Sequence, residues 1–234
     1  MRLFDIVEHY ERQGGAFWAS LSVLQERLET IDTLIFDWDG VFHDGRKNDQ
    51  GGSSFSEVDS MGVNMLRFGL FLRQGIMPRC IILTGEDNST ARYFAQREKF
   101  DAVVFSAKDK KRAFEQLNEY LPLKGERSLF FFDDILDLGL AADVSLRILI
   151  RHSGSPGMTH FIKENDLADY RSGNDANGHG VREATEMLLN CMDKFTETIE
   201  KRSSFHADYA LYWEKRQSGT TRIFKYDPKG LQSY

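Results

Sequence analysis

Cysteine is scarce in this sequence, which excludes a fold held together by a disulfide framework. The 234 residues include two cysteines, Cys80 and Cys191, and both lie in apolar, periodic stretches. Such cysteines are typical of buried free thiols in a reducing compartment, so we expect a cytoplasmic protein. His152, His160 and His206 show no metal-ligand spacing with either cysteine, which argues against a zinc site.

Long hydrophobic runs and an excess of basic residues are also missing. No apolar stretch approaches the roughly 20 residues of a membrane-spanning helix, and the first residues lack the charged-then-apolar pattern of a signal peptide. The formal net charge is −6, whereas nonspecific nucleic-acid binding requires a basic face. We therefore expect neither a membrane nor a nucleic acid as a partner.

The chain is organised around the stretch Thr33–Gly45, which has the sequence TLIFDWDGVFHDG. Four residues suited to a buried strand lead into Asp37 and Asp39, and Gly40 follows at once. This order is typical of a central parallel strand whose carboxyl end opens onto a site. Because two unpaired carboxylates are too costly to bury, the pair either lies on a solvated turn or shares a cation.

Strand and helix patterns alternate from residue 33 to residue 150 with short connections. After the first strand, 33–36, apolar runs predict strands over 80–83, 102–105, 129–132 and 146–150. Helical periodicity between them is carried by Val63, Leu66 and Leu70, by Ala91, Phe94 and Ala95, and by Ala113, Leu117 and Leu121 or Phe114, with Gly75 and Asn88 or Ser89 as caps. The pattern predicts a Rossmann-like α/β fold, with a parallel sheet and helices on both faces.

Polar residues follow the ends of four of these predicted strands. They are Asp37 and Asp39, then Thr84, then the lysines at 108, 110 and 111, and finally Asp133, Asp134 and Asp137. In a parallel sheet the carboxyl ends of the strands share one edge, where ligands bind. Crowded carboxylates favour a hard divalent cation such as Mg²⁺, and a lysine and a hydroxyl beside it suit a phosphoryl group. One aspartate can then act as the nucleophile and a second as acid and base.

These motifs resemble those of the haloacid dehalogenase superfamily, in the same order along the chain. The matches are DWDGV at 37–41, ILTG at 82–85, a lysine after the third strand, and FDDILD at 132–137. The resemblance implies that Asp37 is nucleophile and metal ligand, and that Asp39 is acid and base and lends its carbonyl to Mg²⁺. Dehalogenases lack this second aspartate, so Asp39 points to the phosphatase branch.

The remaining motif residues take their implied roles from the same resemblance. Thr84 and a motif lysine would hold the phosphoryl oxygens. Lys110 fits the motif best, while Lys108 and Lys111 remain alternatives. Metal ligation would be completed by Asp133 and Asp137, the latter through water, with Asp134 less clearly placed.

A narrower resemblance covers about residues 33–189. The hairpin-like segment 45–56, Asp59, Arg97 and GHGVRE at 178–183 look like the capless phosphatases acting on 3-deoxy-D-manno-octulosonate 8-phosphate and related keto-acid phosphates. The resemblance implies a chain without a cap domain that forms a homo-oligomer, a tetramer in that family. It also implies substrate contacts from Gly85, Arg97 and Arg182.

Three departures from that family bear on the substrate. Glu86 stands where an arginine is usual, Phe132 where a glycine is usual, and the GHGVRE segment is one residue shorter. If Glu86 faces the pocket as a substrate contact, it would repel a substrate carboxylate. His43 is expected on a surface loop rather than at the substrate. His179 and Arg182 either reach a bound anion, in their own or a neighbouring subunit, or cap the next helix.

Three parts are expected along the chain. Residues 1–30 form a helical N-terminal extension, in which Gly14-Gly15 precedes a helix that carries Trp18 to Ile31. Residues 31–202 form the haloacid dehalogenase-like catalytic domain, which ends in one helix over about 181–201. Residues 203–234 form an aromatic-rich C-terminal extension with a short strand at 220–226, a candidate subunit contact.

The sequence thus predicts a Mg²⁺-dependent phosphatase. Its substrate would be a small phosphomonoester, such as a sugar or keto-deoxy sugar acid phosphate, hydrolysed through an aspartyl-phosphate. Two alternatives stay open. One is a noncatalytic binding or scaffold subunit that keeps the fold, and the other is a phosphomutase.

Overall fold

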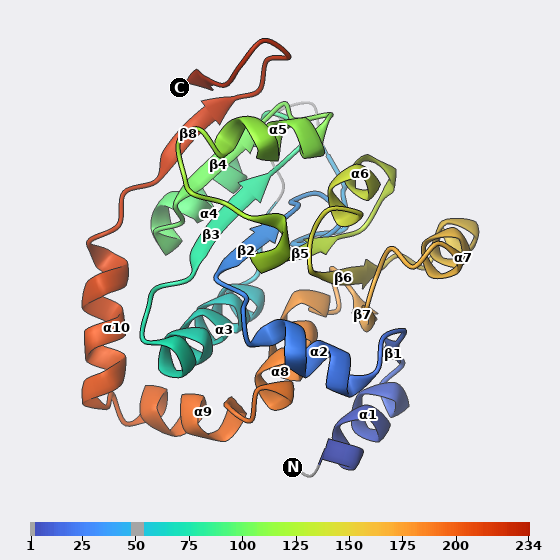
Figure 1. Cartoon of the computed structure of the whole chain (residues 1–234), viewed down its shortest axis with the longest axis vertical. Helices are drawn as coiled ribbons and strands as arrows, with labels where there is room; N and C mark the ends of the chain where they lie inside the picture. Colours follow the sequence, from blue (N-terminus) through green and yellow to red (C-terminus); the bar gives the residue numbers. More distant parts are fainter. Residues whose placement is uncertain (1–2, 48–53) are drawn as a thin grey trace.

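A nine-stranded, mostly parallel sheet forms the centre of the molecule (Figure 1). The computed structural model describes residues 3–47 and 54–234. The strands in these residues are β1 (Ala16–Phe17), β2 (Thr33–Phe36), β3 (Arg79–Leu83), β4 (Ala102–Phe105), β5 (Ser128–Phe132), β6 (Leu146–Arg151), β7 (Tyr170–Asp175), β8 (Arg222–Lys225) and β9 (Gln232–Ser233). Their order is β1-β7-β6-β5-β2-β3-β4-β8-β9, and only the outermost strands β1 and β9 pair antiparallel.

Helices cover both faces of the sheet. The described residues contain α1 (Leu3–Arg12), α2 (Leu21–Leu28), α3 (Glu57–Gln74), α4 (Ser89–Glu98), α5 (Lys110–Leu117), α6 (Leu138–Ala141), α7 (Pro156–Glu164), α8 (Gly180–Cys191), α9 (Phe195–Ser203) and α10 (Ala207–Gln217), with short 3₁₀ turns at Gly125–Arg127 and Ile135–Asp137. None of these helices is long and apolar enough to cross a membrane. The predicted Rossmann-like fold is therefore confirmed.

Side chains alternate along the central strand β2 and divide the core in two. Leu34 and Phe36 join a cluster with α3, α4 and α8, whereas Ile35 joins a cluster with α5, α6 and α7. Residues buried on both faces explain why the sequence of this strand is continuously apolar. The predicted helix cap is also confirmed, because Gly75 ends α3 in a left-handed conformation (φ 73°).

Two predicted helices have different limits in the structure. Trp18 does not lie in a helix, because Ala16–Phe17 form the edge strand β1 and the helix begins only after the N-cap Ser20. The single helix predicted over about 181–201 is two helices, α8 and α9. The chain turns between them at Asp193, which has a positive φ of 54° that a continuous helix cannot contain.

The C-terminal segment is built into the fold through α10, β8 and β9. The predicted strand near 220–226 exists as β8, and it extends the sheet by pairing parallel to β4. The aromatic side chains Tyr209 and Tyr212 of α10 are buried against Phe68 of α3. Residues 48–53 of the proposed hairpin at 45–56 lie outside the described residues, and subunit contacts stay a prediction.

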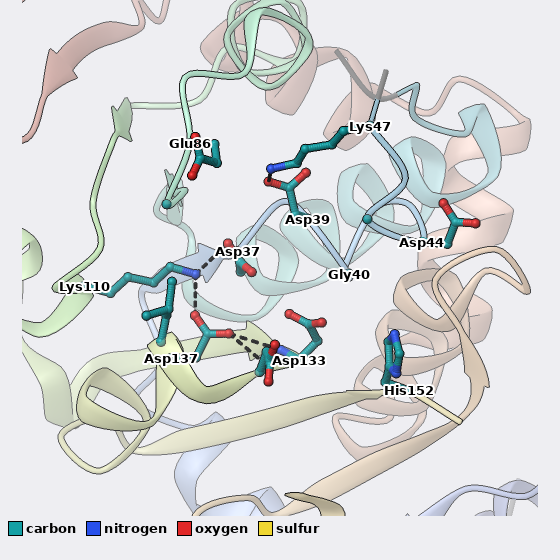
Figure 2. A pocket seen from close by; sticks show the side chains of 14 residues that line it. Asp37, Asp39, Gly40, Asp44, Lys47, Glu86, Lys110, Asp133, Asp137 and His152 are labelled. Atoms are coloured by element: carbon teal, nitrogen blue, oxygen red, sulfur yellow. Dashed lines mark hydrogen bonds and ion pairs between the residues drawn. The ribbon is translucent and has the colours of Figure 1, made fainter. Parts of the chain in front are cut away.

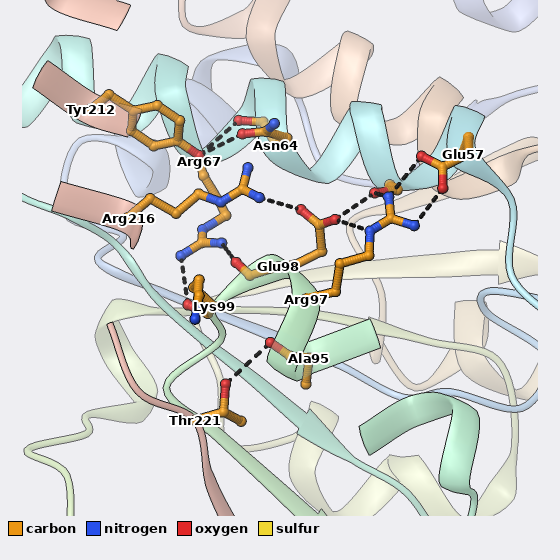
Figure 3. Close-up of polar contacts among 11 residues, drawn as sticks. Glu57, Asn64, Arg67, Ala95, Arg97, Glu98, Lys99, Tyr212, Arg216 and Thr221 are labelled. Atoms are coloured by element: carbon orange, nitrogen blue, oxygen red, sulfur yellow. Dashed lines mark hydrogen bonds and ion pairs between the residues drawn. The ribbon is translucent and has the colours of Figure 1, made fainter. Parts of the chain in front are cut away.

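A buried ion pair fastens α10 to the rest of the domain (Figure 3). Arg216 of α10 lies 2.9 Å from Glu98 at the end of α4, and both side chains are about 5% exposed. Arg67 of α3 donates to the backbone carbonyl of Glu98 (2.6 Å), and the Tyr212 hydroxyl donates to Asn64 (2.7 Å). Helices from three parts of the chain are thus joined by desolvated polar contacts.

Candidate active site

The candidate site lies at the carboxyl end of β2, where the strand order reverses. From β2 the chain builds β3 and β4 on one side, and then β5, β6 and β7 on the other. Such a switch point leaves a crevice that loops from both halves surround. Asp37 follows β2 directly, and its backbone N–H donates to the carbonyl of Phe131 (2.9 Å), so the sheet register fixes its position.

The turn after Asp37 requires a glycine. Gly40 has a φ of 85°, and a Cβ at this position would collide with the carboxylate of Asp133. The missing side chain therefore allows the loop after β5 to approach the loop after β2. This approach brings the two acidic motifs together.

Lys110 lies between the acids, where α5 begins. Its Nζ is 2.5 Å from Oδ1 of Asp37 and also contacts Oδ1 of Asp137, with only 2% of the lysine side chain exposed (Figure 2). Burial would lower the pKa of Lys110, but the charges of these two carboxylates raise it instead. Lys111 points elsewhere and pairs with Asp143 (2.7 Å), and Lys108 is exposed.

Asp137 also shapes the loop that carries Asp133. Its Oδ2 accepts hydrogen bonds from the backbone N–H groups of Asp133 (3.3 Å) and Asp134 (3.1 Å). One carboxylate oxygen therefore holds the loop while the other faces Lys110. These contacts explain why FDDILD contains an acid four residues after Asp133.

The donor set fits a hard divalent cation. Asp37, Asp133 and Asp137 each offer a carboxylate oxygen, and these oxygens all lie within 4.8 Å of one another. Burial and neighbouring carboxylates raise the pKa values of Asp37 and Asp133, because Lys110 alone does not neutralise three acids. An oxygen-only group with this excess of negative charge is the kind of site that Mg²⁺ prefers.

The side chains of His43 and Lys47 contact the Asp39 carboxylate at the edge of the site. Its Oδ1 lies 3.0 Å from His43 Nε2, and its Oδ2 lies 3.1 Å from Lys47 Nζ. Burial alone would raise the pKa of Asp39, but the contacts with His43 and Lys47 outweigh it and lower the pKa. The expectation of a surface histidine at position 43 was wrong, since its side chain is 7% exposed beneath Asp39.

A cavity of about 340 Å³ opens above these groups (Figure 2). Besides the residues already described, its walls include Gly85, Glu86, Asp44, Asp134, Leu136 and His152. Glu86 is exposed and faces the cavity from the loop after β3, as its predicted place at the substrate requires. The sequence reasoning missed Asp44, Lys47 and His152. His152 could have been found, because it directly follows β6 at the same edge of the sheet.

Thr84 lies at the end of β3, beneath the cavity. It is fully buried, and its hydroxyl is 3.5 Å from the backbone nitrogen of Glu86. Its side chain thus supports the Gly85–Glu86 turn of the cavity wall.

The structure does not bring Arg97 or Arg182 to this cavity within one chain. Arg97 pairs with Glu57 (2.7 Å) and Glu98 (2.9 Å) on the flank of the domain. The side chain of Arg182 pairs with Glu186 (2.5 Å), and its backbone N–H donates to Asp59 (3.0 Å). Both guanidinium groups are committed to local carboxylates, so a substrate contact by either one is not supported by this geometry.

His179 contacts a residue of α3 rather than the cavity. It stands at the start of α8, and its Nδ1 lies 3.1 Å from Oδ2 of the buried Asp59. Asp59 thereby ties α3 to the first turn of α8, where a carboxylate is favoured by the helix dipole. Of the two readings left open for His179, this geometry matches the one in which it belongs to the helix start.

Known structures resemble this chain in fold at low sequence identity. No family model and no curated protein matches it. A magnesium-, phosphate- and KDO-bound 3-deoxy-D-manno-octulosonate 8-phosphate phosphatase from Moraxella catarrhalis superposes with a TM-score of 0.63 at 20% identity, over 78% of this chain and 99% of that one. The cobalt-bound deoxy-D-mannose-octulosonate 8-phosphate phosphatase from Haemophilus influenzae gives 0.59 at 21%, over 72% and 93%.

A third structure agrees with these two. The 3-deoxy-D-manno-octulosonate 8-phosphate phosphatase from Yersinia pestis has a TM-score of 0.59 and 22% identity, over 74% of this chain and 89% of that one. At such identities the likeness establishes architecture. The chain therefore has the same α/β fold as these solved phosphatases.

Proposed function

We propose that the protein is a Mg²⁺-dependent phosphatase that hydrolyses a small phosphomonoester through a phosphorylated Asp37. One observation carries the proposal: Asp37, Asp133, Asp137 and Lys110 converge from three separate loops on one cavity at the end of the central strand. A structural role would not require a buried lysine between two buried carboxylates with a third carboxylate close by, because such a group costs stability.

The residues divide the reaction into two displacements. Asp37 attacks phosphorus, the bond to the alcohol breaks, and Asp39 gives its proton to the departing oxygen. Asp39, now a carboxylate, takes a proton from water, and that water cleaves the acyl phosphate. Phosphate leaves, and Asp37 and Asp39 return to their starting states.

Other groups hold the phosphoryl oxygens. Lys110 supplies a positive charge beside Asp37, and Gly85 lines the cavity wall above the buried Thr84. Asp37, Asp133, Asp137 and the carbonyl of Asp39 would hold Mg²⁺, which when bound neutralises charge on the phosphoryl group. Asp137 would thereby connect the bound cation to the loop of Asp133 and Asp134, whose backbone N–H groups already donate to its carboxylate.

The substrate class follows from the cavity and from the solved relatives. Three of these are named for a keto-deoxy sugar acid phosphate, and a cavity of about 340 Å³ suits a phosphosugar. Glu86, Asp44 and Asp134 on the rim favour a leaving group without a carboxylate. An oligomer that covers this open cavity, as the family resemblance implies, is part of the proposal.

Phosphate release from a panel of phosphate esters, measured with Mg²⁺ and with EDTA, tests the proposal. We expect Mg²⁺-dependent turnover that falls by about 10³-fold or more in Asp37→Asn. Asp143→Asn, which removes an exposed carboxylate, is the matched control and should keep full activity. A folded wild-type protein without turnover of any ester would instead favour the scaffold alternative. Transfer of phosphate to a second sugar position rather than to water would favour a phosphomutase.

A further inference from the structure

The two carboxylate oxygens of Asp39 have different surroundings. Oδ1 is buried and faces His43, whereas Oδ2 faces Lys47, whose side chain lies across Asp39 in Figure 2. A carboxyl group that exchanges a proton with substrate must do so through an oxygen that substrate can reach. The surroundings therefore decide which oxygen can take part.

His43 is fixed from both its ring and its backbone. Its Nδ1 accepts a hydrogen bond from the backbone N–H of Gly45 (3.0 Å), so the neutral ring carries its proton on Nε2, toward Asp39. Its carbonyl accepts from the N–H of Gly40 (2.9 Å). The imidazole is therefore part of the same tight turn as the aspartate that it faces.

The contact between His43 and Asp39 is bent rather than linear. Nε2 and Oδ1 are 3.0 Å apart, and both atoms are buried without a well-directed hydrogen bond to any described residue. Among the described residues these two atoms face each other, and separating them would leave both without a polar neighbour. The buried contact therefore restrains the rotation of the Asp39 side chain.

Lys47 is a different kind of partner. Its side chain is 43% exposed and lines the mouth of the cavity. An exposed ion pair contributes little and is readily exchanged for solvent or substrate. The leaving-group oxygen can therefore replace Lys47 at Oδ2, but it cannot replace His43 at the buried Oδ1.

We propose that His43 is a positioning residue that occupies Oδ1 of Asp39 and thereby assigns proton transfer to Oδ2. The inference rests on the proposed function. As the bond from phosphorus to Asp37 forms and the bond to the alcohol breaks, the proton moves from Oδ2 to the departing oxygen. The Nε2–H of His43 stays in place and faces the Oδ1 of the resulting carboxylate.

A comparison of two substrates tests this role. We would measure kcat/KM, which covers phosphoryl transfer to Asp37, for glycerol 2-phosphate and for p-nitrophenyl phosphate. The first must receive a proton as it leaves, and the second departs readily without one. His43→Phe removes the Nε2 donor, whereas His43→Gln keeps an N–H donor at a similar reach. Phe42→Leu is the matched control, because it loosens packing in the same buried turn without touching Asp39.

His43→Phe should lower kcat/KM for glycerol 2-phosphate by about tenfold or more, and for p-nitrophenyl phosphate by less than about threefold. His43→Gln should recover most of the loss, and Phe42→Leu should affect both substrates equally. Equal losses for both substrates in His43→Phe, or no loss for either, would overturn the proposal.

Nuclear magnetic resonance of the ¹⁵N-labelled wild-type ring provides a readout that does not depend on turnover. The His43 signals, identified by their absence in His43→Phe, should show a protonated Nε2 and an unprotonated Nδ1. The opposite tautomer would overturn the positioning role even in an active enzyme. Absence of turnover with the expected tautomer would overturn the proposed function and, with it, the assignment of proton transfer to Oδ2.

Discussion

Replacing Lys110 with methionine tests whether one buried cation balances the acids of the site. The lysine is 2% exposed and contacts Asp37 and Asp137, so its removal leaves buried carboxylates without a positive partner. Such a break typically costs about 3–5 kcal/mol. Methionine keeps the length and apolar stem of the side chain, so the charge is the main change.

The destabilisation by Lys110→Met also has an upper limit, because a carboxylate that loses its partner can become protonated. A stranded carboxylate can take up a proton, and this costs about 1.4 kcal/mol for each pH unit above its ordinary pKa of 3.8. The penalty of Lys110→Met is then limited to about 5 kcal/mol near pH 7.5 and to about 2 kcal/mol near pH 5. The destabilisation should therefore shrink as the solution becomes more acidic.

Urea unfolding of the metal-free protein at these two pH values measures the free energy of unfolding. Lys111→Met is the matched control, since Lys111 follows Lys110 in the sequence but is half exposed and pairs with Asp143 at the surface. The control should lose less than about 1 kcal/mol at either pH. A loss from Lys110→Met that is equally small, or that does not change with pH, would refute the reasoning.

Three further changes have defined outcomes. Mg²⁺ should raise the melting temperature more near pH 8 than near pH 5. The raised pKa values of Asp37 and Asp133 mean that stability of the metal-free protein is lost as pH rises, and the ion competes with protons; equal gains would contradict this. Arg216→Met should cost about 1–3 kcal/mol, less than a fully stranded pair, because Glu98 keeps Arg97 as a partner. In a chain of this size the melting temperature measured by calorimetry should fall by about 2–4 °C per kcal/mol. An unchanged melting temperature would contradict a stabilising role for the ion pair of Arg216 and Glu98. Glu86→Arg should raise kcat/KM for sugar acid phosphates relative to neutral sugar phosphates, and an unchanged ratio would remove Glu86 from substrate selection.

The strands and the acidic edge could be predicted because each depends on local pattern. Continuous apolar runs such as 33–36 are required wherever a strand is covered on both faces, and the structure buries all four of these residues. Parallel strands place their carboxyl ends together, so Asp37 and Asp133 had to approach each other once the topology was known. The choice of Lys110 among three lysines agrees with its burial beside these acids.

The rest depended on contacts that the local pattern does not contain. His43 looks like an exposed loop residue until the turn at Gly40 folds it under Asp39. Arg97 looks available until α3 brings Glu57 beside it. The break at Asp193 is invisible to helical periodicity, since the apolar stripe continues on both sides of it.

The pairing of β8 with β4 has a practical consequence for work with shortened chains. Without the segment after α10, the backbone amide and carbonyl groups of β4 that now pair with Arg222–Lys225 would face solvent on an apolar strand. An uncapped, hydrophobic border of this kind recruits other chains into intermolecular β-structure. A fragment that stops at Gln217 should therefore precipitate on expression, and a solubility tag would mask the defect rather than repair it.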